Sequence, residues 1–357
     1  MNEVIRKEHF GCLDALRGLA AFFVVVNHLG ERIELFRPDL PAIAWTWLTD
    51  YTSLGVLVFF GISGFVIAHS LRNVVVDSAS FGNFMTRRVV RLTPPYYAAL
   101  ALALVVNAGS AYIKNEDWAF PSAGRMIAHL LYLPDLLNME MINGVHWTLY
   151  VEVQFYLSLC ALVWVAQRLR TRSASLSVGF MALCGTAALT WPLFALRHGR
   201  EHYFLPYWYS FLLGVFLYWH YRHTAPRWLT WSYLGLLGMA WALHQDSLVG
   251  ASFLTGVFIV LASEKDRMQR WLRQRPWQFL GKISYSLYLT HSPIVGAVFY
   301  AGTKAFGDSR STELLLIVPE LAASLVVGTL AWWFVERPAI QWSKGLRRAR
   351  PVVVAVT

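Results

Sequence analysis

Residues 11–30 read GCLDALRGLAAFFVVVNHLG, an apolar run that carries an arginine near its start and a histidine near its end. About 20 helical residues cross the roughly 30 Å hydrocarbon core of a bilayer. Further apolar runs follow, and we interpret them as helices because lipid offers an open backbone no hydrogen-bond partner. The predicted spans are 11–30, 54–71, 92–113, 147–167, 176–196, 204–221, 228–244, 248–263, 284–303 and 313–335. The sequence therefore predicts an all-α, polytopic integral membrane bundle of about ten helices.

The composition supports this class and excludes others. Hydrophobic residues make up 56% of the 357 residues and charged residues only 15%, against about 25% charged in soluble domains. The net charge of +10 would suit nucleic acid, but the basic residues lie in short loops between apolar runs, so we exclude that partner. Cys12, Cys160 and Cys184 show no CxxC spacing, which favours packing over a metal site or a disulfide. We expect one domain, 1–350, and a short tail, 351–357.

Lysine and arginine counts predict the orientation. Alternate loops place 22 of these residues on one side of the predicted spans and 8 on the other. The richer side faces the cytoplasm in multi-pass proteins, so both termini are predicted to be cytoplasmic, in agreement with an even number of spans. We expect the protein in the cell inner (cytoplasmic) membrane. On the far side, the apolar stretch within 122–137 is too short to cross and predicts a re-entrant or interfacial segment.

Arg17 and His28 lie within the first span, where ionisable groups are costly and therefore suggest function. Eleven residues turn a helix by about three full turns, so both side chains point the same way, with their levels about 16 Å apart. Arg17 is thus predicted in the inner leaflet and His28 near the outer one. Asp14, three residues earlier, can pair with Arg17. A snorkelling arginine and an interfacial histidine are the structural alternative.

The fourth span begins His146-Trp147-Thr148 and carries Glu152 in its outer half. Thr148, Glu152 and Tyr156 follow one another at intervals of four and share a helix face. Glu152 is predicted at a depth similar to that of His28, where the two can act as a base and its orienting carboxylate. A structural pair that joins two helices is the alternative.

Three arginines, Arg87, Arg88 and Arg91, stand at the cytoplasmic start of the third span. Guanidinium groups suit bidentate phosphate binding, and Arg88 and Arg91 would share a face if the helix starts early. Positive anchors at the cytoplasmic surface would look the same in the sequence.

Two further segments carry polar or small residues inside predicted spans. Ser284, Tyr288 and His291 lie on one face of the ninth span, and Gly61-Ile62-Ser63-Gly64-Phe65 in the second span permits close backbone approach. Both patterns are also typical of packing and helix shaping.

Taken together, the segments resemble the membrane acyltransferase family 3, whose members O-acylate bacterial surface polysaccharides, lipopolysaccharide and Nod factors. The resemblance covers nearly the whole chain. It rests on Arg17 to His28 (an Arg-x10-His signature), Val58 to Phe65 (FFxxSGF), Arg88 to Arg91 (RxxR), Trp147 to Tyr156 (WxLxxExxFY), Tyr285 to Pro293 (YSxYLxHxP) and Phe334 to Pro338 (closing E-x-P). Thr148 stands where the family more often has serine.

The resemblance implies an acyl-CoA co-substrate from the cytoplasm, with acetyl as the expected group, and a glycan or lipid-linked saccharide acceptor on the opposite side. No permanently bound cofactor or metal is implied. In this interpretation His28 is the general base oriented by Glu152, or forms an acyl-histidine, and Arg17, Arg87, Arg88 and Arg91 bind the donor. The residues expected to line the pore or the acceptor site are Ser63, Trp147, Tyr156, Tyr288 and His291. The rival function is a transporter or flippase of a glycan precursor, against which stands the lack of a visible inverted repeat. The sequence indicates no oligomeric state.

Overall fold

A computed structural model describes residues 9–30, 54–72, 74–196, 203–264 and 267–346. The regular elements in this part of the chain are helices, in the order α1 (Gly11–Gly30), α3 (Gly55–Leu71), α4 (Ser78–Lys114), α5 (Ala123–Leu130), η3 (Gly144–His146), α6 (Trp147–Arg170), α7 (Ala174–Leu193), η4 (Leu205–Tyr207), α8 (Trp208–Arg222), α9 (Arg227–His244), α10 (Ser247–Ala262), α11 (Arg267–Arg270), α12 (Arg275–Phe306), α13 (Arg310–Ala331), η5 (Trp332–Glu336) and α14 (Arg337–Gly345). The all-α prediction is confirmed for these residues. Both chain ends and the predicted domain boundary at residue 350 lie outside them.

A helix occupies each of the ten predicted spans, yet among the described residues five helical stretches are long and apolar enough to cross a membrane. Those five are Gly11–Gly30, Ser78–Lys114, Gly144–Arg170, Ala174–Leu193 and Arg310–Gly345. α8 is a contrasting case, because its 15 residues measure about 22 Å along the axis, less than the hydrocarbon thickness. Most of its residues are buried in the bundle, so its length need not match the lipid.

α4 begins fourteen residues earlier than the sequence predicted. Asp77 caps it: the carboxylate accepts a hydrogen bond from the Ser80 backbone N–H at 2.7 Å, and the Ser80 hydroxyl accepts one from the Asp77 N–H at 2.9 Å. This reciprocal capping box satisfies two otherwise unpaired donors, and its hydrogen bonds from Ser80 lower the pKa of the Asp77 carboxyl. The early start places Arg87, Arg88 and Arg91 inside the helix instead of in front of it.

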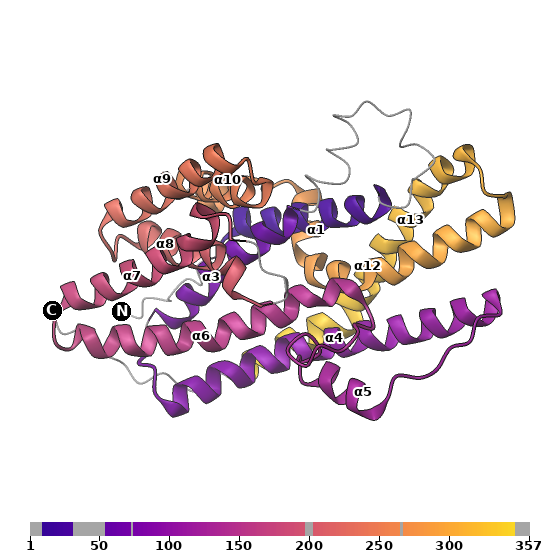
Figure 1. The fold of residues 1–357 in the computed structure, drawn as a ribbon, viewed down its shortest axis with the longest axis horizontal. Coiled ribbons are helices and arrows are strands. Elements are labelled where there is room, and N and C mark those ends of the chain that lie inside the picture. Colours follow the sequence, from indigo (N-terminus) through magenta and orange to yellow (C-terminus); the bar gives the residue numbers. More distant parts are fainter. Residues whose placement is uncertain (1–8, 31–53, 73, 197–202, 265–266, 347–357) are drawn as a thin grey trace, which may run out of the picture.

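Glycines let two pairs of helices come into backbone contact. A Cβ atom added to Gly64 of α3 would lie 1.9 Å from the carbonyl oxygen of Phe211 in α8, and one added to Gly18 of α1 would lie 2.4 Å from the backbone of Gly281 in α12. The close approach predicted for the Gly61–Phe65 segment is therefore confirmed. Through these contacts α3 packs on α8 and α1 packs on α12, and α1 lies near the middle of the bundle (Figure 1).

Replacing Gly64 with alanine is expected to destabilise the fold by about 3 kcal/mol or more, because backbone on both sides must move to admit a methyl group. Thermal unfolding of the purified protein in detergent measures the effect. Gly82→Ala is the matched control, since no atom lies within 4 Å of a Cβ placed there. Equal unfolding temperatures for the two variants would contradict the close helix contact.

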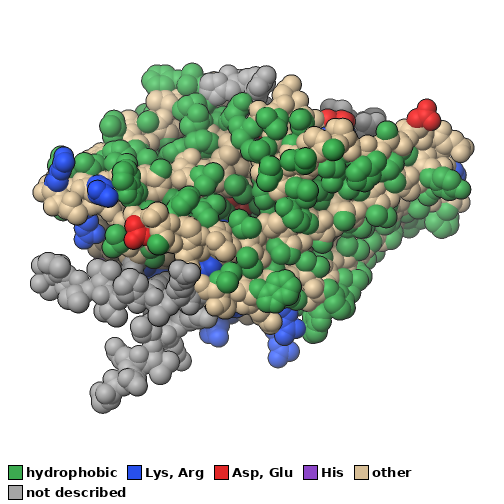
Figure 2. Space-filling model, turned by 90° about the horizontal axis from the view of Figure 1, so that it is seen from below, with side chains coloured by type: hydrophobic (Ala, Val, Ile, Leu, Met, Phe, Trp, Pro, Cys, Tyr) green, Lys and Arg blue, Asp and Glu red, His purple; other side chains and the backbone are tan. Residues whose placement is uncertain are grey.

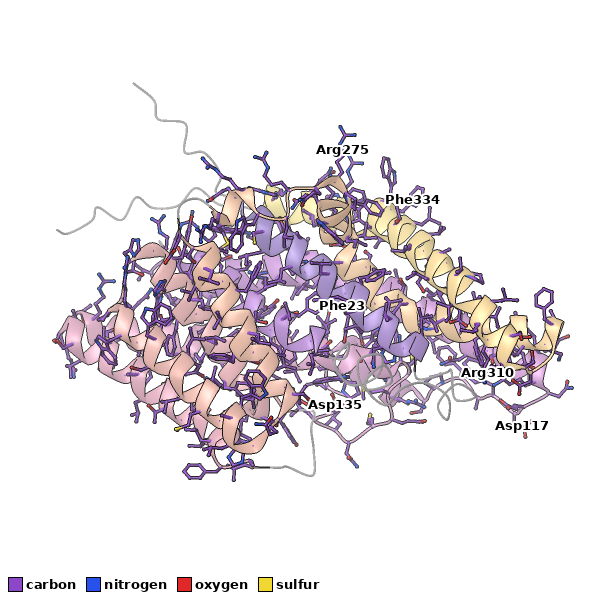
Figure 3. All side chains as sticks on the ribbon, turned by 90° about the horizontal axis from the view of Figure 1, so that it is seen from above. Phe23, Asp117, Asp135, Arg275, Arg310 and Phe334 are labelled. Carbon is purple, nitrogen blue, oxygen red and sulfur yellow. The ribbon has the colours of Figure 1, made fainter. Side chains whose placement is uncertain are left out.

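Basic side chains gather on one side of the bundle (Figure 2). Arg275 at the start of α12 lies on the opposite side of the molecule from Asp117, Asp135 and Arg310, with Phe23 of α1 between them (Figure 3). In the space-filling view, hydrophobic side chains cover the middle of the face, and most of the visible Lys and Arg side chains lie at its left end and along its lower edge (Figure 2). This arrangement fits an apolar belt in lipid with basic residues gathered on one side.

Candidate active site

A cavity of about 90 Å³ lies between α1, α3, α4, α6 and α12. Its volume has room for several water molecules. Charged and polar groups from all five helices line it: Arg17, Ser63, Arg88, Arg91, Thr148, Glu152, Tyr156, Tyr285 and Tyr288. Three guanidinium groups and a carboxylate line one cavity inside an apolar bundle. Because ionisable groups are costly there, they indicate a functional site. We call it the arginine cavity.

Glu152 is held by hydroxyl groups from two helices. Its Oε1 atom accepts short hydrogen bonds from the Ser63 hydroxyl of α3 and the Tyr156 hydroxyl one turn further along α6. The spacing of four residues predicted that Tyr156 shares a helix face with Glu152, whereas the contact with Ser63 joins positions 89 residues apart. These two hydrogen bonds hold the Glu152 carboxyl group between α3 and α6.

Arg88 lies beside this cluster. Its guanidinium carbon is 5.2 Å from the centre of the Tyr156 ring and 5.4 Å from that of the Phe84 ring, distances typical of cation–π contacts. Its Nη2 atom also lies 3.4 Å from the Ser70 hydroxyl. These contacts fix the guanidinium group inside the cavity and not in the surface layer of membrane anchors.

Arg91 lies one helical turn from Arg88 on the same face of α4, as the three-residue spacing predicted, and it also lines the cavity. Arg91 interacts electrostatically with Arg88, Arg17 and the buried Glu336. Arg87 does not line the arginine cavity. One residue turns the helix by about 100°, and the Arg87 carbonyl oxygen instead accepts a hydrogen bond of 2.9 Å from Ser343 of α14.

Arg17 joins α1 to α12. Its Nη2 atom donates to the Ser284 hydroxyl at 3.3 Å, and its Nη1 atom lies 4.0 Å from Asp14, the predicted partner. Ser286, two residues further along α12, donates its hydroxyl to Glu336 at 2.6 Å. Glu336 was absent from our predicted site residues, although the closing E-x-P segment contained it. It ends the π-helical turn η5, a geometry often found at functional sites.

His28 and His291 form a second group at the outer side of the arginine cavity. Their ring centres are 5.1 Å apart, and the centre of the Tyr288 ring lies 5.8 Å from that of His291. Nδ1 of His291 lies 2.8 Å from the Tyr288 carbonyl oxygen. That contact makes Nδ1 the protonated nitrogen, so Nε2 presents a lone pair, and Nε2 has no hydrogen-bond partner among the described residues. The predicted pairing of His28 with Glu152 stays a prediction.

Tyr288 links the histidine group to the arginine cavity, whose wall it forms. Its hydroxyl donates to the Val145 carbonyl oxygen at 3.0 Å and accepts from Thr148 at 2.9 Å. Trp147, which was expected at the pore, packs its ring against Tyr207 at 5.3 Å and Phe60 at 6.2 Å. Trp147 thus contacts the helices that carry the site and is not part of the cavity wall.

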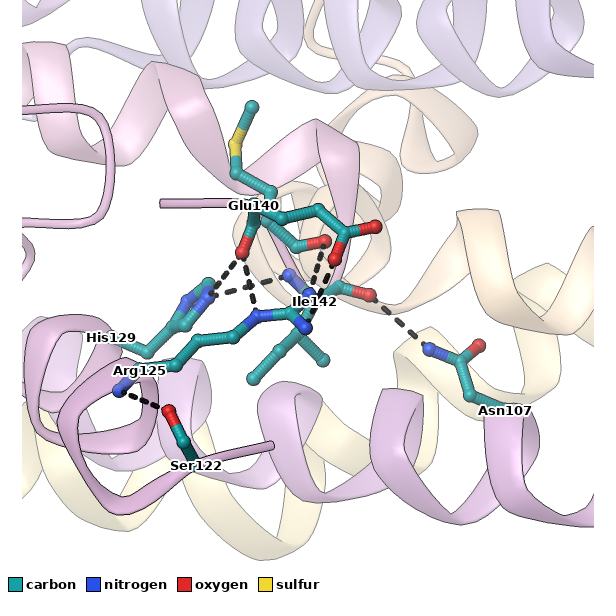
Figure 4. Close-up of polar contacts among 7 residues, drawn as sticks. Asn107, Ser122, Arg125, His129, Glu140 and Ile142 are labelled. Atoms are coloured by element: carbon teal, nitrogen blue, oxygen red, sulfur yellow. Dashed lines mark hydrogen bonds and ion pairs between the residues drawn. The ribbon is translucent and has the colours of Figure 1, made fainter. Parts of the chain in front are cut away.

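The segment before α6 closes the outer side of this region. Arg125 of α5 donates from Nε to the Glu140 carbonyl oxygen at 2.8 Å and pairs with the Glu140 carboxylate at 3.0 Å, and the backbone N–H of Ile142 donates to Nε2 of His129 at 3.3 Å (Figure 4). Burial lowers the pKa of His129. Asn107 of α4 donates to the Ile142 carbonyl oxygen at 3.3 Å. The predicted segment 122–137 therefore contains the short helix α5, and residues 139–144, which we call the strap, are bound to α4.

These features define a class: a membrane-embedded protein with a cationic cavity next to a histidine pair. A family model described as an acyltransferase domain matches residues 10–336. The chain belongs to this family, the membrane acyltransferase family 3, and is a multi-pass membrane acyltransferase.

Three curated relatives match more than nine-tenths of the chain at low sequence identity. The chain is 26% identical to nodulation protein 10 of Rhizobium leguminosarum bv. viciae, over 93% of this chain and 94% of the relative. It is 26% identical to the putative membrane-bound transacylase BcsY of Komagataeibacter xylinus, over 96% and 86%. With the O-acetyltransferase OatA of Staphylococcus aureus the identity is 24%, over 91% of this chain and 56% of that protein. No solved structure matches the chain.

Proposed function

We propose that the protein transfers an acyl group, acetyl by analogy with the O-acetyltransferase relative, from cytoplasmic acyl-CoA to a glycan hydroxyl near the outer side of the inner membrane. The proposal rests on one observation. Arg17, Arg88 and Arg91 line the same cavity as Glu152, next to the pair formed by His28 and His291. Such a set of guanidinium groups suits a phosphate-bearing donor. The basic side of the bundle, where the donor enters, is the cytoplasmic side by the charge rule.

The size of the arginine cavity decides which part of the donor it receives. About 90 Å³ is far below the 300–1,000 Å³ of a site for a drug-sized ligand, so the nucleotide stays at the cytoplasmic mouth. Arg88 and Arg91, which line the cavity one helical turn apart on α4, bind its phosphates from there. The narrow pantetheine arm passes Arg91 and Arg17 and brings the thioester toward His28.

In the chemical step, the acceptor hydroxyl oxygen attacks the thioester carbonyl carbon. His28 takes the hydroxyl proton, the new carbon–oxygen ester bond forms, and the carbon–sulfur bond breaks. Coenzyme A leaves as a thiolate and takes up a proton. An acyl-histidine at His28 would divide the same exchange into two steps. The decisive experiment is transfer of labelled acetyl from acetyl-CoA to polysaccharide by the purified protein in liposomes. Absence of transfer, together with identical O-acyl signals in polysaccharide from cells with and without the gene, would refute the proposal.

The donor site has its own expected result. Arg88→Ala and Arg91→Ala should each weaken acyl-CoA binding by about tenfold or more, since a hydrogen bond to a charged group contributes about 1.5–3 kcal/mol. Lysine at either position should restore part of the affinity, because an ammonium group cannot form the bidentate pair. Arg168→Ala is the control, since Arg168 stacks on Trp164 at the end of α6, away from the cavity wall. Isothermal titration in detergent checks this, and wild-type affinity in both alanine variants would return these arginines to a structural role.

A further inference from the structure

A second hollow, much larger than the arginine cavity, lies between the C-terminal half of α4, the strap residues 142–144 and the C-terminal half of α12. Its volume is about 880 Å³, within the 300–1,000 Å³ range of ligand sites. Small residues of both helices, among them Gly109 and Gly296, hollow it out. We call it the outer groove, because it lies at the ends of α4 and α12 farther from the basic side of the molecule.

Two lysines stand at the open end of the outer groove. The Nζ atoms of Lys114 and Lys304 lie 5.0 Å and 5.8 Å from the centre of the Tyr300 ring, which forms part of the wall between them. Lys304 also donates to the carbonyl oxygen of Ile113 at 3.5 Å. No carboxylate is among the described residues that line the groove. Two ammonium groups beside one aromatic ring, in a groove whose described lining holds no carboxylate, favour an anionic ligand.

The inner end of the groove offers neutral hydrogen-bonding groups. Asn107, Asn143 and Ser292 line it there, and amide and hydroxyl groups match the donors and acceptors of a sugar. Asn107 is held by its bond to the strap (Figure 4). From Ser292 to Lys304 the helix rises about 18 Å, a length that spans several sugar units.

A single layer of residues separates this end from the arginine cavity. Leu289 of α12 lines the arginine cavity and Ser292 lines the groove, and the fully buried His291 lies between them beside His28. On the strap, Asn143 of the groove wall lies 3.3 Å from Nε2 of His146, which is itself 3.3 Å from the Leu289 carbonyl oxygen. The inner end of the groove and the arginine cavity thus approach the His28–His291 pair from two sides, and the thioester that reaches His28 can meet a hydroxyl from the groove there.

We propose that the outer groove is the acceptor site and that it selects an acidic saccharide. The acidic group binds Lys114 and Lys304, and the hydroxyl to be acylated lies several sugars further in, at Asn143 and Ser292. This inference rests on the proposed function and adds to it the charge of the acceptor and the place where it binds. The acidic group is a carboxylate of the glycan or a phosphate of its lipid carrier, two sources with the same chemistry.

The test measures binding to the purified protein in nanodiscs, with oligogalacturonate, a neutral cello-oligosaccharide of equal length, undecaprenyl phosphate and phosphatidylglycerol as probes. We expect at least about tenfold tighter binding of oligogalacturonate or undecaprenyl phosphate than of the neutral sugar, weakened by added salt because exposed charges are screened. The double variant Lys114→Gln, Lys304→Gln should lose this preference. Lys282→Gln, at the other end of α12, is the matched control and should keep it.

Each outcome decides the proposal. A lysine-dependent preference for the acidic sugar or for the polyprenyl phosphate supports it and identifies the source of the charge. No preference in the wild type, an unchanged preference in the double variant, or equal binding of phosphatidylglycerol overturns it. Acyl-CoA affinity should be unchanged in the lysine variants, since the arginine cavity is separate. If the wild type prefers the acidic probe yet never transfers an acyl group, the proposed function fails while the anionic groove stands.

Discussion

Replacing His28 with alanine is expected to reduce acyl transfer by at least about 10²-fold, the lower end of what a general base contributes. Affinity for acyl-CoA should stay at the wild-type value, because the arginines that bind the donor belong to the arginine cavity and His28 packs instead against His291. Transfer of labelled acetyl to polysaccharide, measured beside donor binding on the same preparation, separates the two effects. Full O-acyl content on the polysaccharide of a His28→Ala strain would contradict the assignment.

A histidine control makes this result specific. His223 ends α8 with a positive φ of 54° and is exposed, and asparagine tolerates that backbone conformation. His223→Asn should therefore leave transfer unchanged. Mass spectrometry of the wild type after incubation with acetyl-CoA, without acceptor, distinguishes the two forms of the mechanism. An acetyl group on His28 identifies the covalent route, and an unmodified His28 identifies general-base catalysis.

Local spacing predicted those parts of the site that depend on one helix. Arg88 and Arg91 share a face because they are three residues apart, and Tyr156 reaches Glu152 because it is four residues further along. α4 starts earlier than its apolar run predicts, because the Asp77–Ser80 capping box begins the helix ahead of the arginines. The apolar runs predicted the helices, but the number of spans depends on which helices face lipid, as the short, buried α8 shows.

Contacts between helices could not be read from spacing. Ser63 meets Glu152, and His28 meets His291, because α3 and α1 pack at a particular register against their neighbours. For α1 that register depends on Gly18 and Gly281, where a single added Cβ atom would meet backbone. Periodicity predicts which residues share a face, but the depth at which two faces meet is a property of the packed bundle. Glu336, held by Ser286, was missed for the same reason.

Replacing Glu152 is expected to have the second largest effect. Glu152→Ala should reduce transfer about as strongly as the loss of His28, because it removes the carboxylate from a cavity that also holds Arg17, Arg88 and Arg91. Glu152→Gln should be milder, since the amide oxygen still accepts a hydrogen bond from Ser63 or Tyr156. Comparable yield and a single peak in size exclusion for both variants are the control for folding, because removing one member of a buried charge cluster also costs stability.

The separate effects of the Glu152 variants on kcat and on KM for acyl-CoA show what Glu152 does. If the carboxylate positions the reacting groups, kcat falls in both variants while KM for acyl-CoA stays within about twofold. Ser63→Ala and Tyr156→Phe each remove one of the two hydroxyl groups that donate to Glu152, and each should reproduce part of the fall in kcat. The double variant should lose less than the sum of the two single losses, because both hydroxyl groups act on one carboxylate. A rise in KM with unchanged kcat would show instead that Glu152 serves the donor-binding arginines. Unchanged turnover in Glu152→Ala would remove it from the catalytic machinery.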